Sequence, residues 1–273
     1  MGKIRLALTP VEREWQNVPL YVTARGLTTS AIPYDERMLQ LDLDCIAHVL
    51  DISVSNGQTR SIPLIPTLCV ADFYERVMAA LTELGIHVKI WPMPVEVPNP
   101  IRCTDDRVHA TYDPRAVNRF WTVLVRIATV FSEYRASFRG RHTPVQFFWG
   151  SFDLAYARFS GQPAGAPPNA DRMTRIAMDA QEISAGFWPG DQRYPEPAVY
   201  CYAYPKPTGI ESSKIRPAAA FWSDQLGEFL LPYEDIRSAP SPREALLDFL
   251  ISTYDAGTKL AGWDRSALDG TAR

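Results

Sequence analysis

The stretch HVLDISVSNGQTRSIPLI at residues 48–65 carries the strongest fold signal in the chain. Apolar and polar residues alternate on both sides of Asn56-Gly57, with the period of a half-buried strand. An Asn-Gly pair favours a type I′ turn, because both central residues of that turn need a positive φ. The sequence therefore predicts a β-hairpin at this point.

The alternation extends through the first 66 residues, and it predicts an antiparallel meander. The other segments that carry it are KIRLAL (3–8), PLYVTARGL (19–27) and MLQLDLD (38–44). Apolar residues then recur at helical spacing from Val70 to Leu84, and Gly85 is well placed to end that helix. One face of this helix is expected to cover the sheet.

The rest of the chain mixes helices and strands. Asp113 as N-cap and Pro114 at the first helical position open a long helix. Further expected elements are a strand over 145–159, a helix over 171–184, strands over 197–205 and 227–236, and a helix over 242–260 that begins with a capping box at Ser241 and Glu244. Grouped rather than alternating elements predict an α+β fold, with an antiparallel or mixed sheet and packed helices. A break near 98–112 predicts two subdomains, 1–98 and 99–273, which can form one continuous domain.

Composition excludes several classes of protein. At 273 residues with 46% hydrophobic and 22% charged side chains, the chain can fold around its own core. A formal charge of -3 and the lack of a basic cluster argue against nucleic acid as a partner. No window reaches the roughly 18 apolar residues of a membrane span. Four scattered cysteines without CxxC spacing indicate reduced thiols, so we expect a cytoplasmic location.

Familiar catalytic motifs are absent from the sequence. It contains no P-loop, no GxGxxG after a strand, no HExxH and no GxSxG. Candidate site residues therefore come from segments in which aromatic, glycine and acidic residues are dense.

The first such segment is FFWGSFDLAYARFSG at residues 147–161. An ionised Asp153 among aromatic side chains costs several kcal/mol unless it is paired or hydrogen-bonded. A functional interpretation makes Asp153 a general base, Arg158 an anion clamp and Trp149 part of a ligand-binding wall. The alternative is a structural role, either in an Asp153–Arg158 pair or as an Asp that turns the backbone after Gly150.

The second segment is QEISAGFWPGD at residues 181–191, which places Gln181 and Glu182 on the last turn of the expected helix. A carboxylate there meets the negative end of the helix dipole, at a cost of about 0.3–1 kcal/mol. A cation, a metal or a substrate donor would compensate Glu182, and so would bulk solvent. The glycines around Trp188 allow close backbone approach, as in the wall of a binding site.

Two further candidates lie in the first half of the sequence. His109 precedes the expected cap of the long helix, where it can act as a base or ligand, or as a structural residue. Arg25 lies among hydroxyl-bearing residues at 21–34 and can clamp an anion, or belong to an ordinary polar hairpin.

These segments together resemble the bacterial proteins of domain of unknown function family 5996. The resemblance covers nearly the whole chain and is most specific in Gly-Ser-Phe-Asp-Leu (150–154) and Gly-Phe-Trp-Pro-Gly (186–190). It implies membership of a family without an assigned activity, cofactor or substrate. Similar proteins also carry a segment ahead of Gly2, so we expect more exposed apolar surface near residues 3–8.

The chain departs from the family pattern at two positions. The resemblance implies that the positions of Gln146 and Gln181 are usually His. If those His bind a metal in relatives, this chain is expected to bind it poorly, because a Gln oxygen is a weak ligand for imidazole-preferring metals. If they act as acid and base, Gln keeps the hydrogen bonding but cannot exchange a proton.

The leading functional hypothesis is an enzyme that acts on a small, partly aromatic molecule by acid–base or hydrolytic chemistry. Its proton-transfer residues would be Asp153, Glu182 and His109, with Arg25 or Arg158 as the clamp. Its pocket walls would be Trp149, Trp188 and Tyr202. The alternative is a non-catalytic protein that binds a small molecule, which the amides of Gln146 and Gln181 favour. A protein-interaction role is the third possibility, and the sequence specifies no oligomeric state.

Overall fold

The fold of the chain is α+β, as predicted, in a computed structural model that describes residues 1–94 and 97–270. The chain forms two compact units. The first unit contains Met1–Glu12, Gln16–Val125 and Phe148–Ser151. The second contains Arg13–Trp15, Arg126–Phe147 and the chain from Phe152 onward. The predicted boundary at residue 98 lies within the first unit.

The first unit is built on an antiparallel sheet. Its strands are β1 (Tyr21–Val22), β2 (Gly26–Thr28), β3 (Ile32–Tyr34), β4 (Arg37–Asp44), β5 (Val49–Val54) and β6 (Thr59–Pro63), in the order β1-β2-β4-β5-β6 with β3 also paired to β4. The predicted hairpin at Asn56-Gly57 is confirmed between β5 and β6. Its turn is not type I′, because Gly57 has a φ of 88° whereas Asn56 keeps a negative φ.

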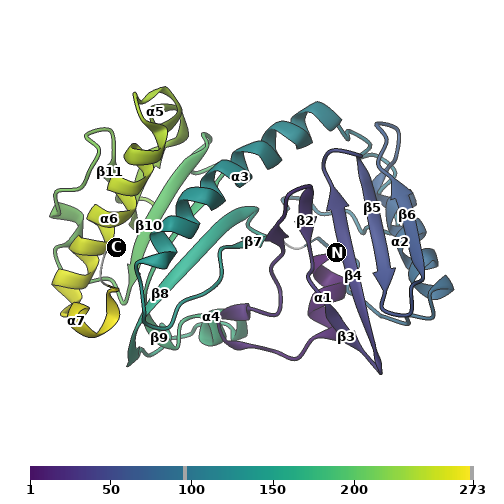
Figure 1. Cartoon of the computed structure of the whole chain (residues 1–273), viewed down its shortest axis with the longest axis horizontal. Helices are drawn as coiled ribbons and strands as arrows, with labels where there is room; N and C mark the ends of the chain where they lie inside the picture. Colours follow the sequence, from purple (N-terminus) through teal and green to yellow (C-terminus); the bar gives the residue numbers. More distant parts are fainter. Residues whose placement is uncertain (95–96, 271–273) are drawn as a thin grey trace. The chain divides into compact units, whose positions relative to one another are not determined.

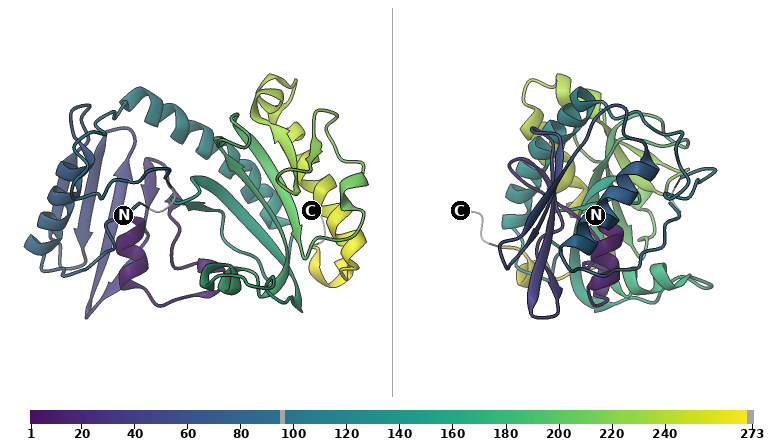
Figure 2. Two further views of the ribbon diagram at one scale, coloured as in Figure 1. Left: turned by 180° about the vertical axis from the view of Figure 1, so that it is seen from behind. Right: turned by 90° about the vertical axis from the view of Figure 1, so that its right-hand side faces the viewer.

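Helix α2 (Val70–Glu83) covers this sheet, as predicted (Figure 2). Its Val77 and Leu81 pack in one core with Leu41 and Ile52, which alternate on the inner face of β4 and β5. Gly85, with a φ of 70°, follows the end of the helix.

The strand expected at residues 3–8 is wrong, because this segment forms helix α1 (Gly2–Leu8). Ile4 enters the core at 1% exposure and Leu8 packs against it one turn later, which is helical spacing. A run of six residues fits both the strand period of two and the helix period of 3.6, so the pattern alone cannot distinguish them. We expected exposed apolar side chains in this segment, and they are found only in part: Leu6 is 37% exposed, whereas Ile4 is buried.

Helix α3 (Pro114–Ala136) begins where predicted, with the Arg115 N–H donating to Asp113 Oδ1 at 2.8 Å. The division between the two units falls inside this helix, between Val125 and Arg126.

The second unit contains the other sheet. Its strands are β7 (Gln146–Phe148), β8 (Asp153–Pro163), β9 (Ala180–Trp188), β10 (Ala198–Tyr204), β11 (Phe221–Ser223) and β12 (Glu228–Pro232), in the order β11-β12-β10-β9-β8-β7. The single strand expected at 145–159 is wrong, since a turn separates β7 from β8 and gives Phe152 a φ of 62°.

The helix expected at 171–184 is also wrong beyond its first turns. Only α4 (Arg172–Ala177) is helical, and β9 follows it directly. Glu182 of β9 is paired with Phe159 of β8 on one side and with Tyr204 of β10 on the other. Two ladders of backbone hydrogen bonds therefore outweigh the helical spacing of a few Ala and Ile residues.

Helices of the second unit cover one face of its sheet (Figure 1). The main one is α6 (Pro242–Ala261), which starts at Ser241 as predicted. An ideal Cβ on its Gly257 would lie 2.8 Å from Ile183 Cδ1 of β9, so this glycine permits the close approach. The short helices of this unit are η1 (Arg13–Trp15), α4, η2 (Ile210–Ser212), α5 (Tyr233–Ser238) and α7 (Arg265–Leu268). Among the described residues, no helix combines the length and apolarity needed to cross a membrane.

Candidate functional site

Side chains alternate along each strand of the second sheet, so its two faces carry different residues. The face that we call the helix-covered face carries Tyr156, Arg158, Ile183, Cys201 and Ala203. The opposite face, which we call the acidic face, carries Asp153, Phe159, Glu182, Ser184, Gly186, Trp188, Tyr200, Tyr202 and Glu228.

Two carboxyl groups from distant segments meet two tyrosines on the acidic face. The Tyr200 hydroxyl donates to Asp153 Oδ2 at 2.5 Å, and the Tyr202 hydroxyl donates to Glu182 Oε1 at 3.1 Å. The two phenol rings stack with centroids 6.3 Å apart. Asp153 and Glu182, at 7% and 5% exposure, are therefore linked through neighbouring side chains of one strand.

Gly186 makes the first of these hydrogen bonds possible. It is the cross-strand partner of Tyr200, and an ideal Cβ at this position would lie 2.3 Å from the phenol. With no side chain there, the Tyr200 ring lies across β9 and reaches Asp153 on β8.

The acidic face changes its charge near neutral pH. Burial raises the pKa of Glu182 to about 7, opposed by the hydrogen bond from Tyr202 and reinforced by the negative charge of Glu14. Burial likewise raises the pKa of Glu228 to about 7. Burial also raises the pKa of the Tyr200 and Tyr202 phenols well above the usual value, so both remain donors.

A guanidinium group lies close to Glu182. Arg141 is centred 4.0 Å from the ring of Phe159, the cross-strand partner of Glu182. Its Nη1 binds Glu14 Oε1 at 2.8 Å, so part of its charge is already neutralised. This partial neutralisation leaves burial as the main influence on the Glu182 carboxyl.

A cavity of about 260 Å³ opens at the ends of β9 and β10. Its lining includes Gln181, Glu182, Tyr204, Lys206, Thr208 and Trp263. Gln181 is held by the Ser160 hydroxyl, which donates to its Oε1 at 3.1 Å. The Lys206 ammonium lies 3.2 Å from Glu211 and 4.8 Å from the centre of the Trp222 ring. An amide, a cation and aromatic rings thus belong to residues around one small cavity, and Glu182 reaches it from the strand whose other face carries its carboxyl.

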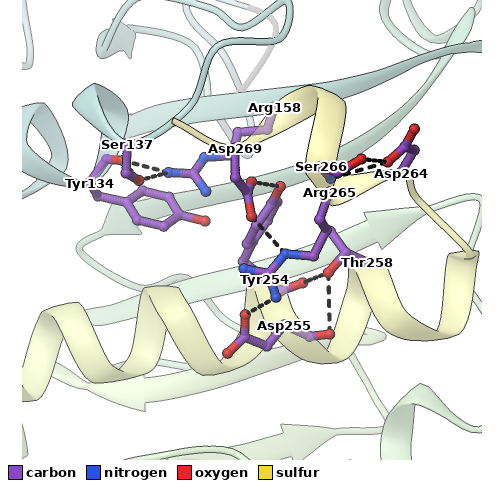
Figure 3. A network of polar contacts seen from close by, with 10 residues as sticks. All are labelled: Tyr134, Ser137, Arg158, Tyr254, Asp255, Thr258, Asp264, Arg265, Ser266 and Asp269. Carbon is purple, nitrogen blue, oxygen red and sulfur yellow. Dashed lines mark hydrogen bonds and ion pairs between the residues drawn. The ribbon is translucent and has the colours of Figure 1, made fainter. Parts of the chain in front are cut away.

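Arg158 lies on the helix-covered face, away from Asp153 and Glu182. Its guanidinium is 3.5 Å from the ring centre of Tyr134 and 4.4 Å from that of Tyr254. It donates to the Tyr134 carbonyl at 2.5 Å and to Ser137 Oγ at 3.2 Å (Figure 3). The contacts around this guanidinium are those of a structural cation in an aromatic cage.

The cage is extended by a polar network at the end of α6 (Figure 3). The Tyr254 hydroxyl donates to Asp269 at 2.7 Å, and Arg265 binds both Asp269 and Asp255 at 2.7 Å. This network fixes the Tyr254 ring against Arg158.

The other predicted ligand-binding residues are distributed over both units. In the second unit, Trp188 lies on the acidic face at 7% exposure, and Gln146 is 2% exposed with no partner for its Oε1 among the described residues. In the first unit, Arg25 Nε binds Asp44 at 2.5 Å, Trp149 Nε1 donates to the Val18 carbonyl at 3.1 Å, and His109 Nδ1 lies 2.8 Å from Asp106 Oδ2.

The residues that sequence reasoning missed are Tyr200, Glu228 and Arg141. The strand expected at 197–205 contained the signal for Tyr200, since period two places it on the same face as Tyr202. Glu228 and Arg141 carried no comparable pattern. In the part of the chain that the structure describes, no cluster of three or more His, Cys, Asp or Glu could hold a metal ion.

A family model, described as a family of unknown function (DUF5996), matches residues 1–270. The chain belongs to this family. The predicted resemblance is therefore confirmed. In this DUF5996 protein the most specific stretches supply Asp153, Gly186 and Trp188, all on the acidic face. No curated protein and no solved structure matches the chain. Its chemistry is therefore argued from geometry.

Proposed function

We propose that this protein is an enzyme that transfers a proton to or from a small, partly aromatic molecule, with Glu182 as general acid and base. The observation that carries the proposal is a buried carboxyl that receives a hydrogen bond from Tyr202, has its pKa raised to about 7, and belongs to a residue beside a cavity. A group with such a pKa is present in both protonation states at neutral pH, where acid–base catalysis is most efficient.

The hydrogen bonds of Glu182 assign separate roles to its two oxygens. Tyr202 donates to Oε1 and orients the carboxylate, which leaves Oε2 to accept the proton. The proton comes from a carbon or hydroxyl group of the ligand, or from a water molecule in a hydrolytic reaction. Lys206, in the same cavity, stabilises a carboxylate or a developing oxyanion of the ligand.

The aromatic part of the ligand contacts the rings that line the cavity, Tyr204 and Trp263. A volume of about 260 Å³ is close to the lower end of ligand pockets, which favours a molecule of one ring with a short polar chain.

We place this activity in the bacterial cytoplasm, without nucleic acid as a partner. The support for the compartment is that Cys45, Cys69, Cys103 and Cys201 are all free thiols. The net charge of -3 argues against a polyanionic partner.

Proton exchange tests the proposal without knowledge of the product. A panel of aryl-substituted 2-oxo acids and ketones is incubated with the protein in D₂O, and loss of the exchangeable C–H signal is followed by NMR. A parallel panel of aryl esters reports hydrolysis. We expect a catalysed reaction that falls at least about 100-fold in Glu182→Gln, as is typical of general acid–base residues.

The matched control is Glu133→Gln, which changes an exposed carboxylate paired with Arg243 on the protein surface. It should leave the rate unchanged. An equal rate in Glu182→Gln and wild type would remove Glu182 from the reaction.

The second candidate function is non-catalytic binding of a small molecule, favoured by Gln146. A buried amide oxygen without a partner among the described residues costs free energy unless a ligand donates to it. A ligand that raises the melting temperature of wild type but not of Gln146→Leu, without turnover in either panel, would support this function over the first.

A further inference from the structure

The first unit contains its own cavity, of about 340 Å³, next to the start of α2. Its wall is mostly apolar, with Leu43, Leu64, Ile65, Leu68, Val70 and Phe73. Apart from the thiol of Cys69, the polar side chains belong to one short segment that carries His109, Thr111 and Tyr112. No Asp, Glu, Lys or Arg among the described residues lines it. The cavity therefore suits a molecule with an apolar body and one polar end.

Asp106 holds the His109 ring at the polar end. Its side chain is 7% exposed, and Oδ1 accepts the backbone N–H groups of Val108 and His109 at 3.2 and 3.0 Å. Its Oδ2 lies 2.8 Å from His109 Nδ1. Because a carboxylate only accepts, Nδ1 carries the hydrogen and Nε2 of the neutral ring keeps its lone pair. In its neutral form, His109 thus presents Nε2 as a hydrogen-bond acceptor, on a side chain that is 61% exposed.

The segment around His109 is anchored to the helix behind it. The Val70 N–H donates to the His109 carbonyl at 3.1 Å, and the Ala71 N–H donates to the Asp106 carbonyl at 2.9 Å. The first N–H groups of α2 are therefore occupied and offer nothing to an anion. The carboxylate of Asp106 also repels a second negative charge close to the imidazole.

Tyr112 adds a fixed aromatic surface to the same end. Its hydroxyl is 2.9 Å from His48 Nδ1, and the two rings meet edge to face with centroids 5.9 Å apart. Phe73 also lines the cavity, so the cavity offers two aromatic rings to a ligand.

We propose that this cavity binds a small neutral phenol or aromatic alcohol, whose hydroxyl donates to His109 Nε2 while its ring lies against the apolar wall. A volume of about 340 Å³ is at the lower end of ligand pockets, which limits the ligand to one or two rings. The site is independent of the Glu182 cavity, since every residue that lines it belongs to the first unit.

A matched pair of probes tests the proposal on the unmodified protein by isothermal titration calorimetry. The probes are 4-ethylphenol and 4-ethylanisole, which share the ring but differ in the hydroxyl that donates. We expect 4-ethylphenol to bind about fivefold more tightly, the effect of one ordinary hydrogen bond. In His109→Ala this difference should disappear, whereas the weaker binding of 4-ethylanisole should be unchanged.

A second variant tests the location of the probes. Ile65 is 43% exposed and lines the cavity, so Ile65→Trp fills it from the surface without disturbing the core. Binding of both probes should be lost, while the circular dichroism spectrum stays that of wild type. Three results would overturn the proposal: no saturable binding of 4-ethylphenol, equal affinities for the two probes, or unchanged binding in Ile65→Trp.

Discussion

The two faces of the second sheet carry buried charge in opposite ways. On the helix-covered face, the Arg158 guanidinium is surrounded by aromatic rings and bonded to the Tyr134 carbonyl, so its charge is compensated. On the acidic face, Glu182 is buried and Glu228 is half-buried, each without an adequate cation, so their pKa values rise to about 7. The comparison indicates that one face stabilises the fold, whereas the other retains groups that can exchange protons.

The largest expected effect is on the helix-covered face. Arg158→Ala should lower the free energy of unfolding by about 3–5 kcal/mol, because it leaves a cavity and removes a donor from the Tyr134 carbonyl. Urea denaturation at pH 7 measures it. Arg158→Met, which keeps most of the volume, should lose less. A loss below about 1 kcal/mol in Arg158→Ala would contradict the structural role of this residue.

On the acidic face, the expected effect is a loss of stability at high pH, as Glu182 becomes ionised. The pKa of Glu182 is raised from 4.5 to about 7, so the folded state holds the proton more tightly than the unfolded chain. Stability contributed by the protonated group is complete below pH 4.5 and is lost as the pH rises through 7. The loss is at most about 3 kcal/mol.

Glu182→Gln should remove this pH dependence, since a neutral amide cannot ionise. Urea denaturation at pH 5 and pH 8 should show a smaller difference in Glu182→Gln than in wild type. Identical differences in the two proteins would mean that Glu182 does not titrate between these pH values.

A smaller loss of stability is expected at Gly186, which lets the Tyr200 ring reach Asp153. Gly186→Ala introduces a Cβ that would lie 2.3 Å from the Tyr200 phenol, and should cost about 1–3 kcal/mol in urea denaturation. Truncating the ring in Gly186→Ala/Tyr200→Ala should reduce the cost of the alanine. Gly165→Ala is the control, because no atom lies within 4 Å of its ideal Cβ. Equal costs at both glycines would mean that the close contact with Tyr200 is unimportant.

The smallest effect concerns a single hydrogen bond. The hydrogen bond from Tyr202 stabilises the ionised form of Glu182. Tyr202→Phe removes this donor, so the pKa of Glu182 should rise above about 7. The acidic midpoint of the pH–rate profile in the exchange assay should move to higher pH, with a loss of about 1 kcal/mol in the interaction. A midpoint that moves to lower pH would contradict the assigned direction of this bond.

Local signals in the sequence were sufficient for several elements. The turn at Asn56-Gly57, the helix start at Asp113 and the cap at Ser241 were found because each acts through residues within one turn. The same reasoning assigned Asp153, Glu182 and Tyr202 to a site but made Glu182 part of a helix. Had residues 180–188 been expected as a strand, period two would have placed Glu182, Gly186 and Trp188 on one face.

From its residue order alone, the chain specified its family, its α+β class, the starts of α3 and α6 and the end of α2, since caps and turns need no distant partner. Long-range pairing settled that residues 180–188 form a central strand, because the ladders come from β8 and β10 rather than from neighbouring residues. It also separated Arg158 from Asp153. Five positions apart in one strand, they face opposite sides of the sheet, and the surroundings of each side determine whether its charge stabilises or titrates.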